Sequence, residues 1–299
     1  MRWPTFFGIC LLAGAITPAR MVGADDDYAK EIEGWRTERA QRLTTPDGWL
    51  TLVGLYFLET GDNPAGTAAD NSIVLTKGPA HLGTVTLGSD GRVKIALTPG
   101  SDARVNGRSV LAADLYAGAE IKPAVVSFGT VSFFVIERGG KLALRVKDSE
   151  AERRTHFAGL DYFPIDPAWR IEAAWTPFDQ PREIQIANIL GQVSPALVTG
   201  KAVFERDGKK CELLPIEDEP GGPLFFVISD ATSGKETYGA ARFLYAEPPV
   251  DGKVVLDFNR AQNPPCAFTP FATCPLPPKE NKLPFAVTAG EKSYRGSHE

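Results

Sequence analysis

The sequence predicts a mostly β protein: a sandwich-like or barrel-like body of many short antiparallel strands, with one N-terminal helix. Three observations support this fold class. The 299 residues include 29 glycines and 24 prolines, which favours strands joined by turns over long helices. Short apolar stretches follow one another closely from Gly48 onward, with turn sequences between them. Helical spacing of apolar residues is confined to residues 26–43.

Residues 1–24 have the pattern of a cleavable secretory signal. Arg2 gives a positive start, and the apolar run of residues 6–16 is too short to span a bilayer, which needs about 20 residues. Small residues at 22–24 precede an acidic run that begins at Asp25. An uncleaved anchor helix is the alternative. The sequence therefore predicts an exported chain, periplasmic or secreted, with no integral membrane segment after cleavage.

The predicted helix covers residues 26–43. Tyr28, Ile32 and Trp35 share a face with Leu43, so this face is expected to pack against the body. The helix is expected to end before Pro46, because the residue preceding a proline disfavours the helical conformation.

After the helix we expect a single domain, residues 25–299, with two β halves at 48–150 and 169–292 and a seam near 156–175. Tight hairpin turns are predicted at Ser89-Asp90-Gly91, Asn106-Gly107, Gly139-Gly140, Asp207-Gly208 and Asp251-Gly252.

Near the C-terminus the sequence predicts a strand, a long loop and a last strand. In the strand 254–259, alternation places Val254, Leu256 and Phe258 on one face, and Asp257 and Asn259 on the other. Six prolines within 259–282 predict an irregular loop. A final strand is predicted over 283–291.

Charge excludes one class of partner. Without Arg2 and Arg20 the mature chain of 275 residues has 30 basic and 37 acidic residues, a net charge of about −7. The charges are scattered along the chain. Nucleic-acid binding needs a basic face, so no nucleic-acid partner is expected. A small molecule or a glycan remains as a ligand.

Standard catalytic signatures are absent from the sequence: it has no nucleophile elbow, Walker loop, dinucleotide fingerprint or zinc-protease motif. No cofactor is predicted. His156, in the seam, is a candidate site residue, and an ordinary polar loop residue is the alternative. Cys266 and Cys274 could supply three zinc ligands together with His156, but their spacing does not require a metal, so none is predicted.

The polar residues of segment 229–260 are the main candidates for a ligand site. They combine carboxylates, an amide, two guanidinium groups and a phenol, a set that can hold a sugar or an anion or perform acid–base chemistry. Residues of these types also cap turns and pair with each other, which is the structural alternative. The candidates are Asp230, Glu236, Tyr238, Arg242, Asp257, Asn259 and Arg260.

Cys266 and Cys274 are predicted to form a disulfide that closes part of the proline-rich loop. Export would place the chain where disulfides persist, and the two cysteines share one loop. Cys211 begins a strand-like stretch and is expected to pack as a small apolar side chain. A reactive Cys266 nucleophile and a pair of metal ligands stay open as alternatives.

Several of these stretches resemble domain-of-unknown-function family 1684, which occurs in bacteria and archaea. They are Trp35-Arg36 with Arg39, the GWL at 48–50, LALRVKD at 142–148, FAGLDYFPIDPAWRI at 157–171, SDATSGKETYGAARFL at 229–244, LDFNRAQNPPCAF at 256–268, CPLPPKENKL at 274–283 and AGEK at 289–292. The resemblance implies one family domain from about residue 29 to 292. It implies no reaction, because the family has none assigned.

Three functions remain open from the sequence. The first is an exported β-scaffold module that binds a small polar ligand or an envelope glycan. The second is an exported hydrolase that uses carboxylates of the 229–260 segment. The third is a structural protein of the envelope.

The export prediction has a direct test. We expect the mature protein to begin at Asp25, because the small residues at 22–24 precede an acidic run. N-terminal sequencing of protein recovered from the periplasm or the medium measures this. Recovery of a membrane-bound form that retains Met1 would contradict it.

Overall fold

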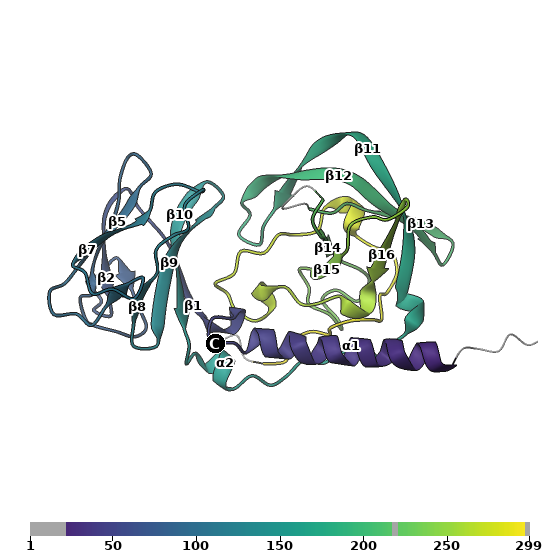
Figure 1. Cartoon of the computed structure of the whole chain (residues 1–299), viewed down its shortest axis with the longest axis horizontal. Helices are drawn as coiled ribbons and strands as arrows, with labels where there is room; N and C mark the ends of the chain where they lie inside the picture. The colour runs from purple at the N-terminus through teal and green to yellow at the C-terminus, as the bar shows by residue number, and fades with distance from the viewer. Residues whose placement is uncertain (1–21, 217–220, 297–299) are drawn as a thin grey trace, which may run out of the picture.

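The computed structural model describes residues 22–216 and 221–296, and it is mostly β. Figure 1 shows two groups of strands, one formed by β1–β10 and the other by β11–β16, with helix α1 (Val22–Leu43) lying along the second group. The prediction of many antiparallel strands and one long N-terminal helix is confirmed. The predicted signal segment lies outside the described residues except for residues 22–24, which begin α1.

The N-terminal group consists of two five-stranded sheets that share one core. The first has the order β1-β10-β9-β8-β6, and the second has the order β3-β2-β4-β5-β7. The strands are β1 (Leu52–Phe57), β2 (Gly61–Gly66), β3 (Ile73–Val74), β4 (Gly83–Leu87), β5 (Val93–Leu97), β6 (Arg104–Val105), β7 (Ala112–Tyr116), β8 (Val126–Phe128), β9 (Val131–Arg138) and β10 (Lys141–Asp148). Val85 and Ile95 from one sheet and Phe133 and Leu144 from the other are buried in the same cluster, so this half is a sandwich.

The second group has a four-stranded sheet of order β13-β12-β11-β16 and a separate β14-β15 hairpin. These strands are β11 (Arg170–Ala187), β12 (Val193–Arg206), β13 (Lys209–Leu213), β14 (Leu224–Ile228), β15 (Arg242–Ala246) and β16 (Lys253–Asp257). Val254, Leu256 and Phe258 lie in the core of this half, as their alternation predicts. Cys211 is buried in the same core.

Short helices connect these strands. They are α2 (Glu152–Thr155), η1 (Trp49–Thr51), η2 (Pro167–Trp169), η3 (Phe258–Arg260), η4 (Pro265–Ala267) and η5 (Lys279–Asn281). The last three lie in or at the edge of the proline-rich segment 259–282, which is otherwise irregular, as expected from its prolines. No helix of the described residues is long and apolar enough to cross a membrane.

The tight turns adopt the backbone conformation that their sequences predict. Between β12 and β13, Asp207 has φ 53° and Gly208 has φ 70°. Both values are positive, as the two central residues of a type I′ hairpin turn require, and this conformation suits Asp-Gly. The turn sequence thus fixes the register of β12 on β13.

The long β11–β12 hairpin reaches across to the N-terminal half. At its tip, the Ile189 N–H donates to the Cys274 carbonyl over 3.0 Å, and the Leu276 N–H donates to the Ala187 carbonyl over 2.8 Å. The Gln192 side chain also donates to the Arg138 carbonyl in the β9–β10 turn over 3.4 Å. The tip therefore contacts both the proline-rich segment and the sandwich.

The structure corrects one strand prediction. Residues 283–291 do not form a strand; they meet their neighbours through single backbone hydrogen bonds, an isolated bridge at Glu291 and side-chain contacts. The carbonyls of Val287 and Ala289 accept hydrogen bonds from the Arg242 guanidinium, and the Val287 N–H donates to Asp230. Side chains thus take the place that the backbone of a neighbouring strand would have occupied.

Helix α1 packs on the second half through one face. Ile32 and Leu43 are fully buried. Arg39 is buried too, and its Nε lies 2.9 Å from Glu291 Oε1, with the Glu291 side chain 0% exposed. The same Arg39 donates to the Asn263 carbonyl over 2.9 Å, and the Asn263 N–H donates to the second Glu291 oxygen over 2.6 Å. A buried, hydrogen-bonded ion pair therefore fixes the helix to the C-terminal segment.

Substitution of Ile32 tests the docking of α1. We expect Ile32→Ala to lower the free energy of unfolding by about 2–5 kcal/mol, because it leaves a cavity at a fully buried position. Thr37→Ala, on the exposed face of the same helix, is the control and is expected to change it by about 0.5 kcal/mol or less. Urea denaturation measures both values. Equal stability of the two variants would show that this face does not pack.

Candidate functional site

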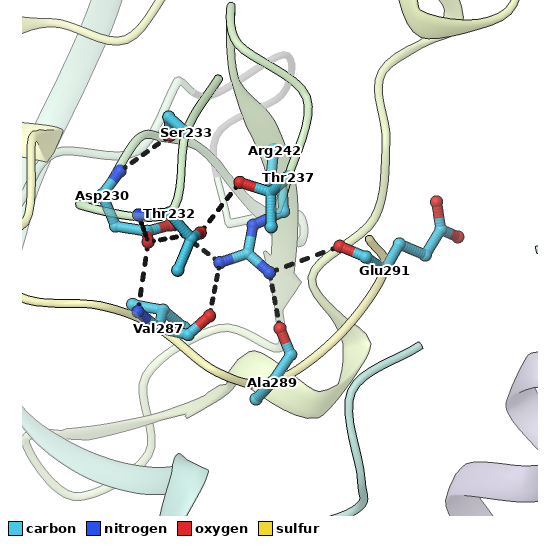
Figure 2. Close-up of polar contacts among 8 residues, drawn as sticks. All are labelled: Asp230, Thr232, Ser233, Thr237, Arg242, Val287, Ala289 and Glu291. Carbon is cyan, nitrogen blue, oxygen red and sulfur yellow. Dashed lines mark hydrogen bonds and ion pairs between the residues drawn. The ribbon is translucent and has the colours of Figure 1, made fainter. Parts of the chain in front are cut away.

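The buried pair of Arg242 and Asp230 is the first of the predicted candidates that the structure brings together. Figure 2 shows the Arg242 guanidinium enclosed by Asp230, Val287, Ala289 and Glu291. Its Nη2 lies 2.8 Å from Asp230 Oδ2, and the two side chains are 1% and 0% exposed. Its two Nη atoms also reach the carbonyls of residues 287, 289 and 291, whereas its buried Nε has no hydrogen-bond partner. Burial lowers the pKa of Arg242, and the Asp230 charge acts in the opposite direction.

The second carboxylate oxygen of Asp230, Oδ1, is also hydrogen-bonded within the protein. Its Oδ1 accepts from the Thr232 N–H over 2.9 Å and from the Thr232 hydroxyl over 2.7 Å, and that hydroxyl lies 2.9 Å from the Thr237 hydroxyl. The Asp230 N–H donates to the Ser233 hydroxyl over 3.1 Å. Both carboxylate oxygens therefore have protein partners, which is the structural role that the sequence left open for this pair.

A second cluster joins Asp257, Asn259 and Arg260 to helix α1. The Tyr28 hydroxyl donates to Asp257 Oδ1 over 2.7 Å and accepts from the Asn259 amide over 3.0 Å. Arg260 pairs with Glu31 of the helix and, over 3.3 Å, with Asp257. Burial and the Asp257 hydrogen bond raise the pKa of Tyr28, so its hydroxyl is a proton donor at neutral pH. Asp257 and Asn259 thus point the same way, toward α1.

The remaining three candidates lie apart from both clusters. Glu236 and His156 are exposed, and the only hydrogen bond of the His156 ring among the described residues is with the neighbouring Thr155 hydroxyl. The Tyr238 hydroxyl donates to the Cys266 carbonyl over 3.1 Å. The eight candidates therefore do not form one site.

The structure corrects the disulfide prediction: Cys266 and Cys274 are both free thiols. They are buried side by side, and the Cys266 N–H donates to Cys274 Sγ over 3.2 Å. A hydrogen bond between the two side chains lowers the pKa of the Cys266 thiol and raises that of Cys274. The two thiols are thus buried neighbours without a covalent bond between them. The described residues contain no group of three His, Cys, Asp or Glu side chains that could hold a metal ion.

A groove of about 1330 Å³ lies between the sandwich, α1 and the second half. We call it the central groove. Its lining includes Trp35, Trp49, Phe134, Arg145, Tyr245 and Asp257. Of the eight candidates, Asp257 and Arg260 line it and the other six do not. The volume exceeds the range of about 300–1,000 Å³ that is usual for drug-sized ligands, so it has room for a larger molecule.

Two aromatic side chains of the groove keep much of their surface accessible. Trp49 is 40% exposed and Tyr245 is 50% exposed. The Tyr245 ring is held by stacking on Phe225, with centroids 4.9 Å apart and an angle of 17°. The Trp49 ring lies 5.3 Å from the Arg145 guanidinium. Both rings are thus positioned by neighbours while they still face open space.

Strand β10 supplies cations to the groove. Arg145 and Lys147 lie on the same face of the strand, opposite to Leu144 and Val146 of the sandwich core. The Lys147 ammonium donates to the Asp47 carbonyl over 2.6 Å. Neither Trp49 nor these two cations was among the predicted site residues. The alternation within LALRVKD was the available signal, because it places both cations on the face that the apolar core does not use.

Comparison with known families gives a match over residues 155–292 to a family described as protein of unknown function, DUF1684. An uncharacterized protein of Haloarcula marismortui, solved by NMR, is 34% identical over an alignment that covers 49% of this chain and 82% of that one, with a TM-score of 0.41. The chain belongs to the DUF1684 family. The matched residues 155–292 include Asp230 with Arg242, Asp257 with its neighbours Asn259 and Arg260, and Cys266 with Cys274. Helix α1 and strand β10 lie outside the match.

The other comparisons add no function. The crystal structure of Rad53 1–466 in complex with AMP-PNP aligns at 10% identity over 75% of this chain and 51% of that one, with a TM-score of 0.15, too low to support any inference. A comparison with curated proteins finds no match.

The buried ion pair of Arg242 with Asp230 gives a prediction that distinguishes a structural role of Asp230 from a role in ligand binding. We expect Asp230→Asn to lower the free energy of unfolding by about 3–5 kcal/mol, because it leaves the Arg242 charge buried without its counter-charge. Glu236→Gln, an exposed change of the same kind, is expected to alter it by about 0.5 kcal/mol or less. Urea denaturation of both variants measures this. Wild-type stability in Asp230→Asn would contradict the structural role.

Proposed function

We propose that the chain is an exported binding protein whose central groove holds a short glycan or a similar polar ligand. The observation that carries the proposal is that Trp49 and Tyr245, two exposed aromatic side chains, line the same groove together with charged groups. An aromatic ring offers a flat apolar surface to the C–H face of a sugar, and neighbouring polar groups bind the hydroxyls. The volume of about 1330 Å³ suits more than one sugar ring.

The positions and partners of the candidate carboxylates fit a binding function better than they fit glycoside hydrolysis. Glycoside hydrolysis uses two carboxyl groups on opposite sides of the scissile bond. Asp230 is closed off by Arg242, and Glu236 does not line the groove. Asp257 does line it, but its carboxylate accepts from Tyr28 and pairs with Arg260. Asp230 and Asp257 therefore hold the protein together, and Glu236 lies outside the groove.

Export is the second element of the proposal. It rests on residues 1–24 alone, whose charged start, short apolar run and small residues are typical of a secretory signal. An exported binding protein meets polysaccharides of the envelope or the medium, which is consistent with a long polar groove.

Calorimetry and thermal shift against a panel of mono- and oligosaccharides test the groove. A ligand present at 100 times its dissociation constant is expected to stabilise the protein by about 2.7 kcal/mol. Trp49→Ala and Tyr245→Ala are each expected to weaken binding about tenfold, because each removes a stacking surface worth about 1.5 kcal/mol.

Phe178→Ala is the matched control, because Phe178 is a half-buried aromatic residue on β11 that does not line the groove. It is expected to leave the dissociation constant unchanged. A ligand whose affinity is the same in all three variants would place its site outside the groove, and the absence of binding across the panel would leave the proposal without support.

A further inference from the structure

One cation of the central groove is buried without a counter-charge. Arg145 is 6% exposed, and no carboxylate pairs with it among the described residues. Its guanidinium lies 5.3 Å from the Trp49 ring centroid, and its Nε has no hydrogen-bond partner. Burying a charge without a partner is costly, so a guanidinium in this state is a strong binding site for an anion that enters the groove.

Arg138 and Lys147 are cationic neighbours of Arg145, and the Asp47 carboxylate offsets part of the Lys147 charge. Burial first, and the charge of Arg138 second, lower the pKa of Arg145 to about 10, so it stays protonated at neutral pH. Lys147 is two residues along the same face. Cys274 acts on Arg145 electrostatically, but its pKa is raised by its hydrogen bond with Cys266 and by burial, so the thiol is neutral.

Several other cations of the groove are paired. Arg39 is bound to Glu291, Lys253 lies 2.6 Å from Glu172, and Arg260 pairs with Glu31 and Asp257. Arg170 also lines the groove but is exposed, so among the described residues Arg145 is the buried groove cation that lacks an ion pair, and it lies beside Trp49. A ligand that carries both an anionic group and an apolar ring face would bind Arg145 and Trp49 at the same time.

We propose that the ligand of the central groove is an acidic sugar, whose carboxylate binds Arg145 while its ring contacts Trp49; this rests on the proposed sugar-binding function. A guanidinium holds a carboxylate through two parallel hydrogen bonds, a geometry that lysine does not reproduce. Lys147 adds attraction for the same charge from its position on the same face of β10.

Calorimetry with matched sugar pairs tests this inference on the purified full-length chain. The pairs are glucose with glucuronate, galactose with galacturonate, and N-acetylglucosamine with N-acetylmuramate. We expect the acidic member of at least one pair to bind at least tenfold more tightly than its neutral partner. Arg145→Met should remove that preference, so that the two members of the pair bind with similar affinity, and Arg145→Lys should retain only part of it.

Two features of the design keep its outcomes separate. Arg145→Met should fold, because it removes an unpaired buried charge and keeps an apolar stem, and a thermal melt checks this. Arg182→Met is the matched control: Arg182 also lies over an aromatic ring, 3.9 Å from the Phe178 centroid, but does not line the groove. It should keep the full acidic preference.

Equal affinity for both members of every pair would overturn the acidic-sugar inference and leave sugar binding intact. An acidic preference that persists in folded Arg145→Met would overturn the role of Arg145. Acetate and inorganic phosphate form a separate arm: if either binds through Arg145 while no sugar binds, both the acidic-sugar inference and the sugar-binding proposal fail.

Discussion

The ion pair of Arg242 with Asp230 is the interaction on which the second half depends. Residues 283–291 have no strand ladder to satisfy their backbone, and at Val287 and Ala289 the guanidinium and carboxylate supply hydrogen bonds instead. Two ionic groups that are 1% and 0% exposed are tolerable because nearly all of their hydrogen-bonding atoms have partners. The same segment carries Glu291, whose carboxylate holds Arg39 of α1. The position of the helix thus follows from a side-chain network in the core.

The central groove is a consequence of how three units are held together. Helix α1 is fixed to the second half by Arg39 and by the Tyr28 contact with Asp257. The sandwich is joined to that half where Leu52 of β1 packs in one cluster with Phe243, Cys266 and neighbouring residues. The face of β10 that is turned away from the sandwich core becomes a wall of the groove. Arg145 is buried on this wall, over the Trp49 ring and within electrostatic reach of Cys274 in the second half.

Periodicity and turn chemistry were enough to predict the helix and the mostly antiparallel β architecture, because both signals are local. The alternation of Val254, Leu256 and Phe258 and the Asp207-Gly208 turn are examples. The site was harder, because its lining comes from residues 31–49, 134–147, 170–172 and 223–262, which only the tertiary fold brings together. The density of polar residues in 229–260 pointed to the groove at Asp257 and Arg260, which line it. Around Arg242 the same density reflects a buried ion pair with Asp230 and its hydrogen bonds. The final strand was mispredicted because an apolar pattern does not show that side chains will take over its hydrogen bonds.

The tip of the β11–β12 hairpin gives the groove a mechanical property. It binds the Cys274–Leu276 segment of one half and the Arg138 carbonyl of the other, at a site separate from the packing of Leu52. Two bodies joined at two separate points can rotate only about the line through those points. The two contacts therefore restrict how far the width of the groove can change, and a restricted groove would lose less conformational entropy on binding a ligand. A groove whose width is restricted in this way would discriminate between molecules by their length and shape.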